Sequence, residues 1–327
     1  MHFRLFTGVL VLSYARLGCC GTCYNASSLL DVDAYMEHYV FRKVRAPSVY
    51  SCASECLMSS VCMSFNFETR TRTCGLNRNS SDQVAITRQA GFLYSDISNW
   101  PKALAGACSE TPCPRSRCHV DRLSRASCGT EFQGCDAPPI VANAEMYHDG
   151  IYEGAVAVYT CRDNFLMCST ENSRVCQSTG NWNGSVGPCA QNSWVNPGIG
   201  IKLDLPCGHS KSFKLTMDIT PTAIERVHVD VRGGGNLLCH IDFRLDQNRT
   251  IFNSRVSGEW GQEIINTPVP LTMGTESLVE IRFYKGMYVL VVDGSSIYSF
   301  ADRYPDEVKQ DVYVSGEAFV SAAHIIV

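Results

Sequence analysis

The chain has 327 residues, too many for one small domain, so its length predicts two or three domains. Its formal net charge is only -4 and no long run of like charge occurs. These values argue against the strongly basic surface that holds nucleic acid or anionic lipid, so we expect no nucleic-acid partner.

The first 21 residues have the pattern of a secretory signal peptide. One Arg and one His precede an apolar run from Leu5 to Leu12, and small residues follow it. The run is too short to span a bilayer, and we expect cleavage between Ala15 and Gly21. Nowhere else do some 18 apolar residues follow one another, and the ending SAAHIIV is too short for an anchor signal. We therefore expect a secreted, extracellular protein without a membrane span.

The 18 cysteines agree with that compartment, because disulfides persist where the medium is oxidising. Sixteen of them lie before residue 190, and only Cys207 and Cys239 follow. This asymmetry predicts small disulfide-stapled modules first and a domain with its own hydrophobic core last. Acceptor sequences for N-glycosylation begin at Asn25, Asn79, Asn183 and Asn248.

Residues 22–108 contain a cysteine pattern, C-x3-C-x5-C-x-x-F-x-F, that begins at Cys52. The stretch 49–60 has helical periodicity, and MSFNF after it reads as a strand. The segment resembles the PAN/apple domain, an α+β module, although another small helix-plus-strand disulfide domain stays open. The resemblance implies three bridges: Cys52–Cys74, Cys56–Cys62 and, tying the ends, Cys23–Cys108.

Residues 109–134 are rich in Pro, Ser and Arg and carry Cys113, Cys118 and Cys128. We interpret them as a cross-linked connector or a degenerate EGF-like loop. His119 follows Cys118 directly, but C-x4-C-H fits no usual zinc spacing and a secreted chain favours disulfides. We therefore expect no metal ion and no other cofactor.

Residues 135–189 carry regularly placed Cys, Gly, Tyr, Trp and Pro residues. The marks are Cys135, Pro138, Gly150, Tyr152, Gly154, Tyr159, Cys161, Cys176, Trp182, Pro188 and Cys189. The segment resembles a sushi, or complement-control, module, which is all-β and depends on its bridges. The resemblance implies the pairs Cys135–Cys176 and Cys161–Cys189, and a core position for Trp182. Cys168 is surplus, and we expect it to pair with the odd cysteine of the connector.

Residues 190–327 alternate between apolar and polar side chains, as in 226–232 and 288–293, which predicts β-strands. Asp293-Gly294 and the run Gly233–Asn236 are hairpin-turn signals. The glycine run is not a phosphate cradle, because neither a helical pattern nor a Lys follows it.

The sequence CHIDFRLDQNRTIFNSRVSGEWGQEII, which starts at Cys239, gathers six side chains suited to a sugar. In a strand, His240, Asp242 and Arg244 point to the same face. The other three follow closely: Asn253, Trp260 and Glu263. A flat aromatic ring beside short polar donors and acceptors can stack on a sugar's C–H face and bond its hydroxyls.

Residues 195–327 resemble the galectin carbohydrate-recognition domain, whose motif is H-x-N-x-R, then N, then W-x-x-E-x-R. The resemblance implies an antiparallel, jelly-roll β-sandwich that binds β-galactosides. His240 and Arg244 would bond the axial hydroxyl of galactose, Asn253 and Glu263 its exocyclic hydroxyl, and Trp260 would stack on the ring.

Two positions depart from that motif. Asp242 stands where the family usually has Asn, and an ionised carboxylate accepts hydrogen bonds but cannot donate them. Ile265 stands where the family usually has an Arg that braces Glu263. We expect Asp242 and Glu263 to raise each other's pKa and compete for Arg244, weakening binding of simple galactosides. A galectin fold that has lost sugar binding is the alternative.

Enzymatic function is the remaining class to weigh. Ala322-Ala323-His324 echoes a serine-protease histidine, but no Gly-Asp-Ser-Gly-Gly sequence occurs. Asp242 and Glu263 could face each other as in a glycosidase, but a shallow sheet offers no means of raising one pKa. We expect a mainly β, multidomain, non-enzymatic lectin-like recognition or adhesion protein, or else a matrix or immune protein that binds proteins. Glycans are the expected partners, with extracellular proteins at the PAN and sushi modules.

Overall fold

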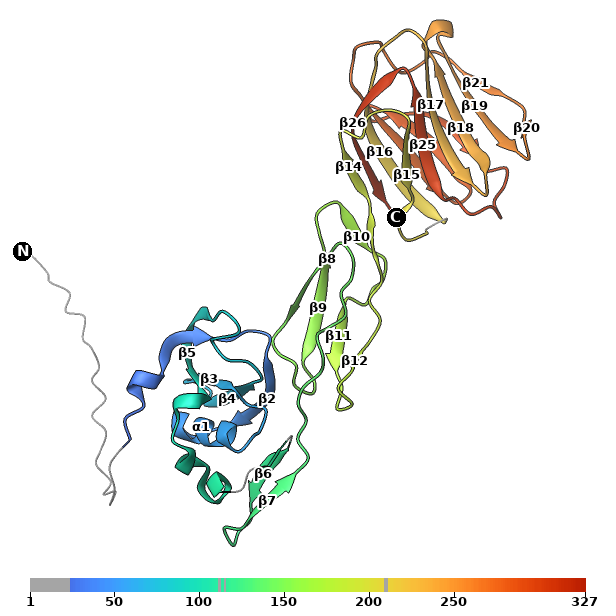
Figure 1. The fold of residues 1–327 in the computed structure, drawn as a ribbon. Coiled ribbons are helices and arrows are strands. Elements are labelled where there is room, and N and C mark those ends of the chain that lie inside the picture. Colours follow the sequence, from blue (N-terminus) through green and yellow to red (C-terminus); the bar gives the residue numbers. More distant parts are fainter. Residues whose placement is uncertain (1–23, 111–112, 115, 209–210) are drawn as a thin grey trace, which may run out of the picture. The chain divides into compact units, whose positions relative to one another are not determined.

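The computed structural model describes residues 24–110, 113–114, 116–208 and 211–327, which divide into two compact units at residues 131 and 132. The predicted signal peptide and Cys23 lie outside the described residues. Strands dominate and all pair antiparallel, which confirms the mainly β fold class (Figure 1). No helix of the described ranges has the length and apolarity needed to cross a membrane.

The first unit is built on a five-stranded sheet and one helix. The strand order is β1 (Asp31–Tyr35), β5 (Thr87–Asp96), β3 (Ser64–Glu68), β4 (Thr73–Asn77), β2 (Val40–Arg45). Helix α1 (Val49–Leu57) begins where the Ser48 side chain accepts a hydrogen bond from the Ser51 amide, an N-cap that satisfies one of its unpaired donors. Short 3-10 turns complete the unit: η1 (Ser27–Leu29), η2 (Ile97–Asn99) and η3 (Lys102–Glu110).

Disulfides staple this unit, and one of them corrects our expectation. Cys52–Cys74 and Cys56–Cys62 are the pairs that the PAN resemblance implied. Cys108, however, bonds Cys118 and not Cys23, and Cys113 bonds Cys128. The reason is that the hairpin of β6 (Arg117–Val120) and β7 (Ala126–Gly129) sets Cys118 beside η3, where both cysteines are buried in one cluster. The connector up to residue 131 therefore belongs to the first unit, and our other domain boundaries stay predictions.

The second unit begins with the sushi segment. Its sheet has the order β12 (Trp182–Asn183), β11 (Ser173–Cys176), β9 (Val156–Cys161), β8 (Ala144–His148), and β10 (Phe165–Met167) pairs β13 (Cys189–Gln191). The bridges Cys135–Cys176 and Cys161–Cys189 are those that the resemblance implied. Cys168 bonds Cys207, so its expected pairing with the connector is wrong: the connector's odd cysteine is taken by Cys108. Trp182 packs against the cluster of Cys135, Ala155 and Cys176, as expected for a core ring.

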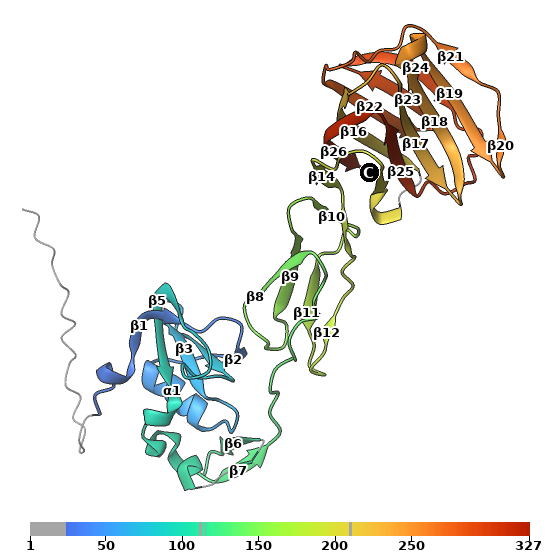
Figure 2. The ribbon, with the colours of Figure 1, turned by 45° about the horizontal axis from the view of Figure 1, so that its top comes forward.

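Two antiparallel sheets form the carboxyl-terminal sandwich (Figures 1 and 2). One sheet has the order β14 (Ser193–Val195), β26 (Ala318–Ile326), β16 (Ser212–Pro221), β22 (Ser277–Tyr284), β23 (Met287–Val292), β24 (Ser295–Ala301). The other has the order β15 (Ile201–Asp204), β25 (Asp311–Gly316), β17 (Arg226–Gly233), β18 (Asn236–Arg244), β19 (Arg249–Val256), β20 (Glu259–Trp260), with β21 (Ile264–Asn266) also on β19. Turns η4 (Pro206–Gly208) and η5 (Leu245–Gln247) complete the domain.

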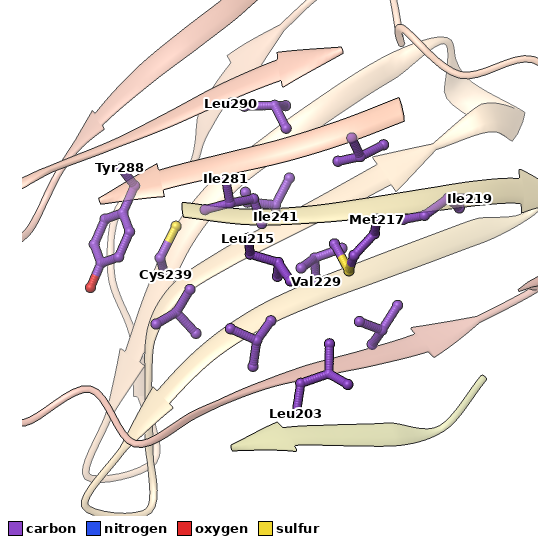
Figure 3. Close-up of a cluster of buried hydrophobic side chains, with 14 of the residues drawn as sticks. Leu203, Leu215, Met217, Ile219, Val229, Cys239, Ile241, Ile281, Tyr288 and Leu290 are labelled. Carbon is purple, nitrogen blue, oxygen red and sulfur yellow. The ribbon is translucent and has the colours of Figure 1, made fainter. Parts of the chain in front are cut away.

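The core lies between these two sheets and is built from alternate residues of each strand (Figure 3). From β18 the core takes Cys239, Ile241 and Phe243, all at most 1% exposed. The hairpin into β18 turns at Gly234 and Gly235, whose φ angles of 58° and 81° are costly for other residues. After a bulge between Val231 and Arg232, Val231 pairs with Cys239 and Val229 with Ile241, so the residues between the core positions point away from the core.

A buried ion pair lies in the loop between β24 and β25. Lys309 Nζ lies 2.5 Å from Asp302 Oδ2, and the two side chains are 1% and 0% exposed. Lys309 also donates to the carbonyl oxygens of Tyr304 and Glu307, so its charge is well solvated by the chain itself. The pair therefore ties together the loop between β24 and β25.

We expect Lys309→Met to destabilise the protein by about 3–5 kcal/mol, because it leaves the Asp302 carboxylate buried without a partner. Adding Asp302→Leu to that variant should restore part of the loss. Lys202→Met is the control, since Lys202 pairs with Asp204 in solvent, where a pair contributes about 1 kcal/mol or less. Urea unfolding followed by circular dichroism measures all of them. Equal effects of the two lysine variants would contradict the prediction.

Candidate functional site

Strand β18 presents the predicted residues on the outer face of the seven-stranded sheet. His240, Asp242 and Arg244 alternate with the core residues Ile241 and Phe243. The neighbours in register complete the surface: His240 lies opposite Asp230 on β17 and Asn253 on β19, and Asp242 lies opposite His228. Strand pairing alone thus brings the first four predicted residues together.

Asp242 is buried on this outer face because basic side chains cover it. Asp242 is only 1% exposed. Arg244 Nε donates to Oδ2 over 2.6 Å, Arg226 Nη1 lies 3.7 Å from the same oxygen, and His228 Nε2 lies 3.3 Å from Oδ1. Burial by itself would raise the pKa of Asp242, but His228 and Arg244 outweigh it and lower the pKa to about 2. Our expectation that Glu263 raises the pKa of Asp242 is therefore wrong.

Arg244 joins the two carboxylates of the site. Its Nε bonds Asp242, and its Nη2 donates to Glu263 Oε1 over 3.3 Å. Desolvation would lower the pKa of Arg244, yet the two carboxylates raise it, so the guanidinium is firmly charged. Ile265 is 53% exposed on the edge strand that follows Glu263. Among the ion pairs of the described residues, Arg244 is thus the one partner of Glu263.

Trp260 supplies the ring that the motif predicts. It is 49% exposed on β20, and its ring centroid lies 5.0 Å from that of His240. His240 is held in turn by Asp230, whose Oδ1 lies 2.5 Å from Nδ1. A carboxylate only accepts, so Nδ1 carries a proton that it donates to Asp230, and Nε2 is the ring nitrogen left for another partner. The half-exposed ring, with the Arg255 guanidinium carbon 5.8 Å from its centre, therefore lies beside His240 and near the charged Arg244 and the half-exposed carboxylate of Glu263.

Asn253 is nearly buried, with 3% of its surface exposed, and its role in ligand binding stays a prediction. Its Oδ1 accepts hydrogen bonds from the Ser254 amide and from Arg303 Nη1, at 2.8 and 3.1 Å. Arg303 also donates to the Gln262 carbonyl oxygen over 2.7 Å. Sequence reasoning missed Arg303, since it lies far along the chain from the motif and no pattern singles it out.

His324 and the four acceptor asparagines, which the sequence also singled out, lie away from this site. His324 is a residue of β26 whose Nδ1 lies 2.5 Å from Ser193 Oγ, and it belongs to the other sheet. Of the four acceptor asparagines, Asn25, Asn183 and Asn248 are exposed and Asn79 is half-buried. Glycosylation of all four stays a prediction. Among the described residues, no group of three or more metal-binding side chains comes together.

Comparison with family models identifies three modules in the expected order. Residues 31–98 match the PAN domain, residues 135–189 the sushi repeat (SCR repeat), and residues 200–325 the galactoside-binding lectin family. These are non-enzymatic families. The third match supports a glycan-binding lectin.

Several galectins are similar in sequence or structure to part of this chain. The chain is 25% identical over 128 residues to galectin-4 of Rattus norvegicus, which is 37% of this chain and 40% of that protein. It is 27% identical over 93 residues to the probable galaptin lec-8 of Caenorhabditis elegans, 28% of this chain and 51% of that protein. The chain thus spans about half or less of these relatives. The solved galectin LEC-6 of Caenorhabditis elegans has a TM-score of 0.39 and 23% identity, over 42% of this chain and 96% of that one.

The lowered pKa of Asp242 predicts an acid-sensitive contribution to stability. Its value of about 2 lies below the ordinary 3.8, so the contribution is complete above about pH 4 and is lost as pH falls towards 2. One pKa unit is about 1.4 kcal/mol, so the loss should be about 2–3 kcal/mol. Asp242→Asn should lack this component, whereas Asp204→Asn, whose carboxylate is mostly exposed, should keep it. Urea unfolding at pH 5 and pH 2 measures the difference, and parallel pH profiles for wild type and Asp242→Asn would refute it.

Proposed function

We propose that this chain is a secreted lectin-like recognition or adhesion protein that binds galactose-containing glycans on the outer face of β18, β19 and β20. The observation that carries the proposal is the half-exposed Trp260 ring lying 5.0 Å from the His240 ring. A Trp ring left in water forgoes the favourable free energy of burying its apolar surface. A half-exposed ring beside ordered polar groups therefore indicates a surface on which a ligand can stack.

The polar groups around the ring suit the hydroxyls of a sugar. His240 Nε2 would accept from one hydroxyl, while Arg244, whose Nε and Nη2 are engaged, would donate through Nη1. Glu263 would accept from a second hydroxyl with its half-exposed carboxylate. Because Asn253 is nearly buried, its contribution would be limited to its amide nitrogen.

The PAN and sushi modules fit an extracellular role. Seven disulfides join all the described cysteines except Cys239, and such bridges persist outside the cell. We assign to these modules contacts with extracellular proteins or further glycans.

A matrix or immune protein whose galectin-like domain no longer binds sugar is the second candidate. The buried Asn253 and the tie between Arg244 and Asp242 favour it, since both remove polar groups from the surface. A glycan array probed with the full chain, with lactose as competitor, separates the two. Lactose-sensitive binding to galactosides supports the lectin, and its absence supports the protein-binding alternative.

We expect Trp260→Ala to abolish glycan binding while leaving the melting temperature nearly unchanged. Stacking on an aromatic ring contributes about 1–3 kcal/mol to a ligand, whereas a ring that is 49% exposed contributes less to folding. The control is Tyr284→Ala, because Tyr284 is an exposed aromatic residue, 60% accessible, on the other sheet. If Trp260→Ala unfolds the protein, Trp260 is a core residue and the stacking role is wrong.

The double change Asp242→Asn with Ile265→Arg should strengthen lactose binding at least tenfold, about 1.4 kcal/mol. It releases Arg244 from Asp242 and gives Glu263 a second cation nearby. Ile326→Arg, on the other sheet and 47% exposed, controls for added positive charge. Calorimetric titration at neutral pH is the measurement. An unchanged dissociation constant would show that these two positions do not limit the affinity.

A further inference from the structure

We propose that Arg303 is a positioning residue for the glycan site: it holds the segment 259–263, and thereby Trp260 and Glu263, without touching the glycan itself. The inference rests on the proposed glycan-binding function, and it extends that function to a residue outside the motif. Arg303 lies in the loop between β24 and β25 and reaches the backbone between β20 and β21.

Besides Arg303, a few short contacts support the segment. Arg255 Nε donates to the Gly258 carbonyl oxygen and its guanidinium carbon lies 5.8 Å from the Trp260 ring centre, while Arg244 bonds Glu263. Strand β20 has two residues, and its pairing with β19 consists of Arg255 with Trp260 and Val256 with Glu259. One further backbone bond joins the Gly261 amide to the Ser254 carbonyl oxygen over 2.9 Å. Residues 257–263 are all exposed, so burial does not fix them. A short exposed edge of this kind opens easily unless something else holds it.

Arg303 supplies that hold through one rigid guanidinium. Nη2 donates to the Gln262 carbonyl oxygen at 2.7 Å, while Nη1 donates to Asn253 Oδ1 and Ser254 Oγ at 3.1 and 3.3 Å. The group therefore bridges β19 and the segment beside it. The planar fork of Arg makes several such bonds with little loss of freedom, which a Lys ammonium matches only in part.

Gly261 is adapted to this contact. A Cβ atom at position 261 would lie 2.3 Å from Arg303 Nη1 and 3.2 Å from Asn253 Oδ1. No side chain can stand at position 261 while the guanidinium is in place. A side chain at position 261 would therefore displace the guanidinium from its contacts.

Arg303 is itself anchored on the side of the core. Its guanidinium carbon lies 4.9 Å from the centre of the Phe300 ring, a cation–π distance. The preceding residue, Asp302, forms the buried ion pair with Lys309. Arg303 therefore connects a buried part of the domain to the exposed segment that carries Trp260 and Glu263.

The test compares Arg303→Ala, Arg303→Lys and Gly261→Ala in the full chain. Arg282→Ala is the control, because Arg282 lies on the other sheet and pairs with Glu280 there. Lactose affinity is measured by calorimetry, hydrogen exchange of residues 257–264 by mass spectrometry, and stability by melting temperature. We expect Arg303→Ala and Gly261→Ala each to weaken binding about tenfold and to speed exchange, with Arg303→Lys between them and wild type.

The double variant of Arg303→Ala with Gly261→Ala sharpens the test. If both changes break the same contact, the double variant should be no weaker than either single one. Additive losses, unchanged affinity, or a loss of affinity without faster exchange would overturn the positioning role, the last because it would make Arg303 a direct ligand contact. If wild type binds no galactoside, the proposed function fails, and exchange in 257–264 alone decides the inference: faster exchange supports it and unchanged exchange overturns it.

Discussion

Strand β18 packs one face in the hydrophobic core and presents the other at the surface, and the candidate site depends on this alternation. Cys239 and Ile241 enter the core between the sheets (Figure 3), as does Phe243. Strand alternation thereby places His240 and Asp242 on the outer face. A slip of one residue would bury the charged set and expose the apolar set, at a cost of many kcal/mol. The hydrophobic core thus holds the polar site in register.

The two parts of the chain reach stability by different routes. The sandwich buries a continuous core, and its Cys239 is an unpaired buried thiol whose pKa burial raises. The smaller modules cannot bury enough area and rely on bridges. Cys168–Cys207 crosses from the sushi segment to the lectin segment, so covalent linkage continues into a domain that is otherwise held by packing.

Local pattern was enough to predict the strands, the turn at Gly234 and the outward set of β18, because side-chain alternation follows directly from strand geometry. The pairing of Cys108 with Cys118 could not be predicted, since it depends on where η3 folds against a hairpin. Arg303 could not be predicted for the same reason, because its contacts join segments 41 and 50 residues apart. Contacts between segments far apart in the chain cannot be predicted from local sequence patterns.

The environment of Asp242 explains how a carboxylate can replace the usual amide without breaking the fold. Three basic side chains, Arg226, His228 and Arg244, surround it, and two of them belong to the neighbouring strand β17. An amide there would bond its neighbours and leave Arg244 to the ligand, whereas the charged group draws Arg244 towards itself. Asp242 therefore stabilises the sheet by holding the Arg244 guanidinium, the group that would donate to a sugar in the proposed site.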